Sequence, residues 1–329
     1  MTQRLLIAGG YGIVGSAIAK HVRKINKDVE IVFAGRNPER GIALAKELGN
    51  AKTAHLDLEN NHGLDNLGEI DLIVSALQDP ADILIGLALE QGIAHIGITK
   101  LADEVAPFTF ATLRIPPKRP IVPLGHSQSG VMTLVALKTA EDFKQIHSIK
   151  LAGLYDDREQ MGPMTVGDSE GFIGRALIRE GGKWVWIEAS QRPIDVQLSD
   201  GSTLEGLPMG LLDVPSLAAA TGAPNVRFDF IQGESIGTRA GNQASQDLYI
   251  EIEGILKSGK RATRRTVVSD PKGQAHLTAL GVLVSIERIL GLDGNPAAAG
   301  GIYLPETLVP VDAAIARFEQ FGVRIFDHS

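Results

Sequence analysis

The chain contains no cysteine among its 329 residues. Without a thiol it can form no disulfide, no thiolate metal site and no cysteine nucleophile. The last absence excludes the aldehyde dehydrogenases that act through a thioester intermediate.

Positive charge is not in excess either. The chain has 32 Lys and Arg against 39 Asp and Glu, so its net charge is −7 and its isoelectric point is near 5.7. This balance argues against a nucleic acid or an anionic membrane as the main partner. No segment approaches the ~18 consecutive apolar residues of a membrane span. Met1-Thr2-Gln3-Arg4 leads directly into an apolar run without a signal-peptide pattern, and we expect a cytoplasmic protein.

Aromatic residues are also scarce, at 5%, whereas glycine is plentiful, at 37 residues. Together with 44% apolar and 22% charged residues, this composition is typical of a globular α/β protein with many tight turns. The length is roughly twice that of a typical domain, so two domains are expected.

The N-terminus carries a nucleotide-binding pattern. The apolar run 5–8 predicts a buried parallel strand, and an amphipathic helix is predicted to end near Ile25. Between them, a G-x-G-x-x-G motif would make a tight turn at its first glycine, admit a pyrophosphate at its second and pack helix against strand at its third. The N–H groups of the helix N-terminus would bind phosphate. The predicted dinucleotide contacts are Gly10, Tyr11, Gly12, Ile13, Val14 and Gly15; a glycine-rich turn without a ligand is the alternative.

The second predicted strand, 30–34, is followed by Gly35, Arg36 and Asn37. An NAD site usually has Asp or Glu at this strand end to bind the ribose 2′-hydroxyl, and Glu30 lies at the opposite end. A guanidinium can instead bind a 2′-phosphate through charge-assisted hydrogen bonds. Gly35 and Arg36 therefore favour NADP over NAD, unless Arg36 is only a solvated loop residue; Asn37 is a further predicted cofactor contact.

Strands and helices continue to alternate, which predicts a doubly wound parallel sheet. Asp57 and Leu58 follow the third strand and are expected near the adenine. Ser75, Ala76 and Leu77 end the fourth strand and are expected to face the cofactor crevice. The predicted strands are 5–8, 30–34, 53–56, 71–76, 94–99 and 120–125.

After Gly125 the pattern changes to strand-like runs joined by turn signals, which indicates hairpins. We expect a second α+β domain built on a mainly antiparallel sheet, with helices at 170–179 and 214–221. The expected division is 1–125 for the Rossmann domain, 126–270 for the substrate and dimerisation domain, and 271–329 for C-terminal helices that return to the Rossmann domain. The antiparallel sheet is the expected surface of a homodimer.

Four segments resemble the saccharopine dehydrogenase-like family of reductases. They are Gly9–Gly15, Ala34–Asn37, Asp71–Ala76 with the later Glu90-Gln91-Gly92, and Gly300–Glu306 with Gly322-Val323. The resemblance implies NAD(P)-linked oxidation or reduction at a carbon–nitrogen or carbonyl centre of an amino-acid-derived substrate. Gly97 stands where the family usually has an Asp, and Leu77–Pro80 replaces its Gly-Pro-aromatic turn. The resemblance therefore does not imply saccharopine itself as the substrate.

Hydride transfer needs positioning and one group that manages a proton or polarises the acceptor. Lys100, directly after the fifth strand, is one candidate, and a surface lysine is the alternative. His126 is the other, since it lies at a strand end beside a helix N-terminus and its pKa range suits proton transfer. The alternative for His126 is a hydrogen-bonded linker histidine.

The other motifs give weaker indications of function. An Arg or Tyr of 155–158 could hold a substrate carboxylate, although a charged turn also explains this segment. His276 reads as a packed or capping residue, and the basic residues of 257–265 as a solvated face. The eight histidines show no metal-ligand spacing, so no metal is expected. None of the four tyrosines begins a Tyr-x-x-x-Lys motif.

The sequence thus predicts an NADP-dependent oxidoreductase that takes an amino-acid-derived imine or carbonyl compound as its small-molecule substrate. A non-catalytic NADP-binding redox sensor or assembly protein is the alternative from another class. A Rossmann enzyme that uses its nucleotide without net redox turnover is a third possibility.

Overall fold

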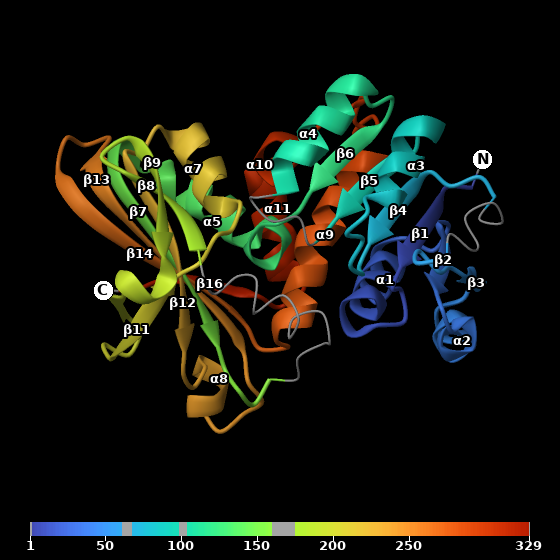
Figure 1. Cartoon of the computed structure of the whole chain (residues 1–329). Helices are drawn as coiled ribbons and strands as arrows, with labels where there is room; N and C mark the ends of the chain where they lie inside the picture. Colours follow the sequence, from blue (N-terminus) through green and yellow to red (C-terminus); the bar gives the residue numbers. More distant parts are fainter. Residues whose placement is uncertain (1, 61–67, 99–103, 160–174, 329) are drawn as a thin grey trace. The chain divides into compact units, whose positions relative to one another are not determined.

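The computed structural model describes residues 2–60, 68–98, 104–159 and 175–328. The chain forms two compact units, and each is described by itself (Figure 1). The first consists of Met1–Gly125 and Ala279–Val309, and the second of His126–Thr278 and Pro310–Ser329. Within the described ranges, no helix is both long and apolar enough to cross a bilayer.

The first unit is built on a seven-stranded sheet in the order β15-β6-β5-β4-β1-β2-β3, with every neighbouring pair parallel. This confirms the predicted doubly wound parallel sheet. Its strands are β1 (Arg4–Ala8), β2 (Glu30–Gly35), β3 (Ala51–His55), β4 (Leu72–Ser75), β5 (Ala94–Gly97), β6 (Pro120–Pro123) and β15 (Gly301–Ile302). The helical segments are α1 (Ile13–Ile25), η1 (Pro38–Gly41), α2 (Ile42–Leu48), α3 (Ile83–Gln91), α4 (Val105–Arg114), the later part of α9 (Gln274–Leu290) and α10 (Pro305–Leu308).

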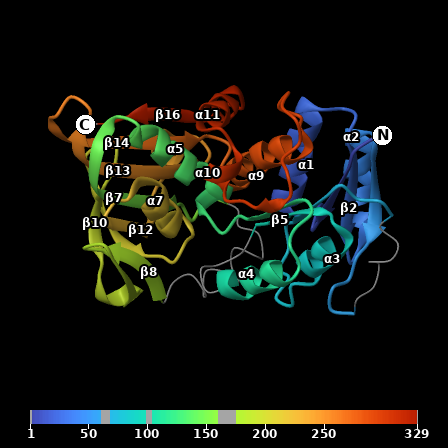
Figure 2. The same ribbon diagram turned by 90° about the horizontal axis from the view of Figure 1, so that it is seen from above.

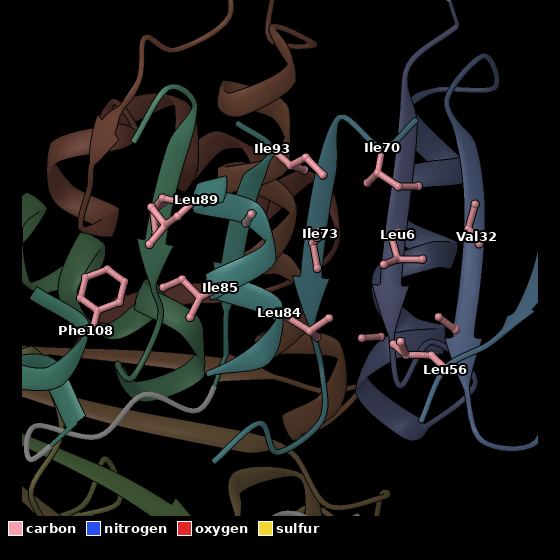
Figure 3. Close-up of a cluster of buried hydrophobic side chains, with 14 residues drawn as sticks. Leu6, Val32, Leu56, Ile70, Ile73, Leu84, Ile85, Leu89, Ile93 and Phe108 are labelled. Carbon is pink, nitrogen blue, oxygen red and sulfur yellow. The ribbon is translucent and has the colours of Figure 1, made fainter. Parts of the chain in front are cut away.

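Helices cover both faces of this sheet, which explains its continuous apolar strands. Figure 2 shows α3 and α4 on one face, with α1 and α9 on the other. Figure 3 shows the core beneath α3 and α4, where Leu6 of β1 and Ile73 of β4 face Leu84 and Ile85 of α3 and Phe108 of α4. All five side chains are at most 3% exposed. This packing holds the carboxyl ends of β1 and β4 at one edge.

The second unit is built on a nine-stranded, mainly antiparallel sheet, as predicted, with one parallel pair between β12 and β7. Its strands are β7 (Phe143–Tyr155), β8 (Arg175–Glu180), β9 (Lys183–Glu188), β10 (Ile194–Gln197), β11 (Thr203–Pro208), β12 (Asn225–Gln232), β13 (Gln246–Leu256), β14 (Arg261–Asp270) and β16 (Arg324–Asp327). Its helical segments are η4 (Ser127–Gly130), α5 (Val131–Ala140), η5 (Ala189–Gln191), α7 (Asp213–Thr221), α8 (Ile236–Arg239), the start of α9 and α11 (Val311–Gln320). Helix α5 packs on β7, β13 and β14, and α11 packs on α5.

Two segments differ from the expectation. Where a helix was expected at 170–179, Arg175–Glu180 is strand β8, and the rest of that helix lies outside the described residues. The Gly181–Gly182 turn explains the strand, because both glycines have positive φ and join β8 to β9 as a hairpin. Residues 310–329 were expected to return to the Rossmann domain but belong to the second unit, since β16 pairs with β14.

Candidate functional site: the glycine turn and the His126 segment

The turn after β1 depends on two glycines that approach neighbouring backbone. Gly9 has φ +78°, and a Cβ there would lie 2.6 Å from the Ala76 carbonyl oxygen. At Gly15, in the first turn of α1, a Cβ would lie 2.4 Å from the Gly9 oxygen. The sequence placed the tight turn at Gly10, but the positive φ belongs to Gly9. Gly10 is needed because a Cβ would meet the Phe33 ring at 2.7 Å.

The N-terminus of α1 meets the requirements of a phosphate site. Gly12 is its N-cap residue, and neither a side-chain cap nor an acidic residue in the first turn occupies this end. The first N–H groups of a helix have no partner inside the helix and carry partial positive charge. A Cβ at Gly12 would lie 3.1 Å from the Gly9 oxygen and, its chain neighbours aside, would meet no other atom of the described residues within 4 Å, so the space in front of this position is open. The turn therefore fits a dinucleotide pyrophosphate at Gly12, Ile13 and Val14.

The end of β4 lies directly beside this turn. The Ala76 carbonyl borders Gly9, and the Ala76 N–H donates to the Ala8 carbonyl at 2.9 Å. Ser75 is buried, and its hydroxyl lies 3.0 Å from Nε2 of His95. Leu77 packs against the core under α3. Parallel pairing of β1 with β4 thus brings Ser75–Leu77 to the glycine turn.

Tyr11 spans from the glycine turn to the end of β2. Its hydroxyl accepts a hydrogen bond from the Asn37 N–H at 2.9 Å. A Cβ at Gly35 would lie 2.2 Å from the Tyr11 oxygen, so the ring occupies the place where an acidic side chain would stand in an NAD site. The Arg40 guanidinium lies 5.8 Å from the centre of the ring. Sequence reasoning missed this coupling, although a tyrosine within the motif and a glycine at position 35 were its visible signals.

Arg36 is solvent-exposed and has acidic neighbours. Its guanidinium lies 3.6 Å from Glu59, and the two side chains are 68% and 81% exposed. Hydrogen bonding to Asn60, backbone N–H groups and the charge of Arg36 hold the pKa of Asp57 below its usual value. Leu58 packs against the core instead of standing free in the loop. Arg36 is thus available to a ligand that displaces a weak surface ion pair.

In the second unit, His126 lies in a buried polar cluster. Its Nε2 is 2.8 Å from the Ser216 hydroxyl, while Nδ1 is buried with no hydrogen-bond partner among the described residues. The Asp213 carboxylate accepts from the Ser127 N–H at 2.6 Å and from the Thr133 hydroxyl at 2.7 Å. Asp213 therefore joins the His126 segment to helices α5 and α7.

Burial changes the acid–base character expected of His126. Desolvation lowers its pKa to about 3, so the imidazole is neutral near pH 7 and outside the range that suggested it as a proton carrier. The next residues are strained, since Gln128 and Ser129 both have positive φ. The Ser129 hydroxyl is buried and without a hydrogen-bond partner in the part of the chain described. Strained backbone and unsatisfied polar atoms of this kind concentrate at functional sites.

The other candidates have structural surroundings. Lys100 lies outside the described residues. Asp156 accepts hydrogen bonds from Ser235 N–H and from the Thr238 hydroxyl, at 2.8 and 2.5 Å; burial raises its pKa, but the hydrogen bonds prevail and bring it to about 2. Arg158 pairs with Glu234, and His276 bonds Asp270. Three basic residues of β14 form ion pairs: Arg261 with Glu253, Arg264 with Asp142, and Arg265 with the half-buried Glu251.

The second unit also holds a cavity of about 330 Å³ on a face of its sheet. Glu251 lies in its wall between Lys150 and Arg265, at 2.9 and 2.8 Å. No residue that the sequence singled out for cofactor or catalysis lines it. The described residues contain no cluster of three or more side chains suited to a metal ion.

Glu159 is expected to make the stability of the second unit depend on pH. Burial raises its pKa to about 7, and Asp270, Asp156 and Asp247 add to this effect, against a hydrogen bond from the Gln274 N–H. The folded state then retains a proton that the unfolded chain, with a pKa near 4.5, loses. The free energy of unfolding is therefore expected to fall as pH rises from about 4.5 to about 7, by at most about 3 kcal/mol.

Glu159→Gln is expected to flatten this dependence and to be more stable than the wild type at pH 8. Urea unfolding between pH 5 and 8 measures it, with the exposed Glu47→Gln as the control. Equal slopes for Glu159→Gln and the wild type would contradict the assignment.

Comparisons with known proteins bear on the fold. No family model and no curated protein matches the sequence. Among solved structures, apo saccharopine dehydrogenase (L-Glu forming) from Saccharomyces cerevisiae matches at a TM-score of 0.71 and 11% identity, over 99% of this chain and 100% of that one. Homospermidine synthase from Legionella pneumophila in complex with NAD matches at 0.68 and 12%, over 100% and 92%. A probable dehydrogenase from Thermotoga maritima matches at 0.53 and 12%, over 98% of both chains. The chain has a saccharopine dehydrogenase-like fold.

Proposed function

We propose that the protein is an NADP-dependent oxidoreductase that transfers hydride to or from an amino-acid-derived imine or carbonyl compound. The observation that carries the proposal is the glycine turn, where Gly9, Gly12 and Gly15 leave an uncapped helix N-terminus for a pyrophosphate. The likeness to a saccharopine dehydrogenase and to a homospermidine synthase with bound NAD supports a nicotinamide dinucleotide. When bound, the nicotinamide would supply the hydride chemistry.

The preference for NADP is carried by the end of β2. Tyr11 fills the space at Gly35, so no carboxylate stands there to bind a ribose 2′-hydroxyl or to repel a 2′-phosphate. Arg36, and Arg40 against the Tyr11 ring, supply positive charge on the same loop. A 2′-phosphate gains from both guanidinium groups, whereas NADH offers neither of them a charged partner.

Arg36→Ala is expected to weaken NADPH binding by ~1–3 kcal/mol, the range for one charge-assisted contact, and to leave NADH nearly unchanged. Titration calorimetry with both nucleotides measures the difference. Glu59→Gln is the matched control, because it removes the competing carboxylate and should bind NADPH as tightly as the wild type or tighter. Equal losses for NADPH and NADH in Arg36→Ala would refute the preference for NADP.

Lys100 and His126 remain our proposed catalytic residues, with a narrower role for His126. A neutral imidazole whose Nε2 is paired with Ser216 offers its Nδ1 for one hydrogen bond to a substrate atom. His126→Ala should then lower kcat while NADPH affinity stays the same. An unchanged kcat would remove His126 from the mechanism.

The non-catalytic sensor remains the second candidate. It stays open because the imidazole of His126 is neutral near pH 7, although the backbone beside it, at Gln128 and Ser129, is strained. The two are separated by incubating the protein and NADPH with a panel of keto acids, amines and aldehydes. NADPH that binds but is never oxidised would favour the sensor. A cytoplasmic location and a homodimer also remain predictions.

A further inference from the structure

Strands β8 and β9 form a hairpin (Figure 1), and its two faces differ in the side chains that they carry. The inner face is apolar, with Ala176, Ile178 and Ile187 buried. Both tryptophans of the chain lie on the other face, where Trp184 is 48% and Trp186 38% exposed. Two large apolar rings exposed side by side on one face form a patch of the kind found at interaction sites.

An arginine from the neighbouring strand stacks on each tryptophan ring. The Arg175 guanidinium lies 4.4 Å from the centre of the Trp186 ring, and that of Arg179 lies 5.4 Å from the Trp184 ring. Stacking of this kind holds both partners in place before anything binds. Tryptophan and arginine are also the residues that most often dominate binding energy at protein interfaces.

The outer edge of β9 is open to pairing. In the described part of the chain, β9 pairs only with β8. The two-residue turn makes Glu180 and Lys183 a hydrogen-bonded pair, and alternation along the strand then directs the N–H and C=O groups of Trp184 and Trp186 away from β8. An unpaired edge of this kind is a template for another strand.

We propose that β9 pairs antiparallel with β9 of a second copy of this chain, about a two-fold axis at Val185. In this register Val185 faces its own counterpart, and Trp184 faces the partner's Trp186. These tryptophan pairs use the outward N–H and C=O groups on both strands, and aromatic cross-strand pairs stabilise sheets. The tryptophans of both copies then form one continuous cluster flanked by the arginines of β8.

Charge supports a second copy as the occupant. Glu188 is the charged residue of β9 on the tryptophan face, and Arg175 and Arg179 of β8 lie on the same face. In this register the partner's Glu188 lies diagonally across from Trp184, and Arg179 stacks on the ring of that Trp184. The proposal specifies a surface for the homodimer predicted above, and it does not depend on the cofactor assignment.

A single cysteine tests the pairing, because the natural chain has none. The Cα atoms of a non-hydrogen-bonded antiparallel pair lie about 4.5 Å apart, within the range of about 4.4–6.8 Å that a disulfide spans. Val185→Cys is therefore expected to give a dimer that is covalent on non-reducing gels and reversed by dithiothreitol. Leu113→Cys, at an exposed position on α4, is the control and should stay monomeric on the same gel. Equal cross-linking of the two variants, or none with Val185→Cys, overturns the proposal.

A second measurement uses the tryptophans themselves. As protein concentration rises through the dimerisation range, their fluorescence should shift to shorter wavelength, because pairing removes them from water. The double variant Trp184→Ala/Trp186→Ala is expected to sediment as a monomer where the wild type is dimeric, while Phe110→Ala, which removes another exposed aromatic ring, stays dimeric. NADPH binding should be the same in all three, which separates this result from the cofactor proposal. A monomeric wild type, or a dimer that persists in the double variant, overturns the pairing.

Discussion

Alanine in place of Gly15 is expected to lower the free energy of unfolding by about 3 kcal/mol or more and to abolish NADPH binding. The new Cβ would lie 2.4 Å from the Gly9 oxygen and 2.8 Å from the Gly10 Cα, and both are backbone atoms that cannot rotate away. If α1 stays in place, the new Cβ overpacks the contact between α1 and β1. If α1 moves away to relieve the clash, gaps open in the core. Urea unfolding and calorimetry with NADPH measure the two effects.

Two glycine variants provide the controls. Gly12→Ala places its Cβ 3.1 Å from a single atom at φ −75°, so the fold should lose little stability while the approach of the pyrophosphate is blocked. Gly86→Ala, inside α3, meets nothing within 4 Å and should stabilise the helix by about 0.5–1 kcal/mol. NADPH binding by Gly12→Ala at wild-type affinity would refute the phosphate site. A wild-type stability for Gly15→Ala would refute the close approach.

The second large effect is expected at Asp213. Asp213→Ala removes the acceptor for the Ser127 N–H and the Thr133 hydroxyl, and leaves both donors buried in a void. Buried donors without acceptors cost about 1–3 kcal/mol each, so the loss of both bonds is expected to cost about 2–6 kcal/mol. Urea unfolding of the whole chain measures it.

Asp213→Asn separates the hydrogen bonds from the charge. It retains one acceptor oxygen and should lose less than half as much stability as Asp213→Ala. Thr133→Val leaves the Ser127 bond intact and should also cost less than Asp213→Ala. An Asp213→Ala protein within about 1 kcal/mol of the wild type would show that the cluster does not hold the His126 segment.

The first sheet was predictable because its signals are local. Apolar runs of four to six residues, each ended by glycine or a polar turn, match β1, β2, β4 and β5 within a few residues. The glycine motif was equally visible, although the positive φ belongs to Gly9 instead of Gly10. Strand β8 was missed because its alternation is weak over six residues, and the pairing with β9 stabilises it.

The sequence by itself determined the fold class, the position of the glycine turn after β1 and the absence of cysteine chemistry. These depend on residue type and on spacing along the chain, which tertiary contacts do not alter. Only the tertiary structure decided that Tyr11 fills the space at Gly35, that Arg36 faces Glu59 and that His126 is buried and neutral. Each of these results from residues far apart in sequence, whose packing sets the space and the desolvation at a position.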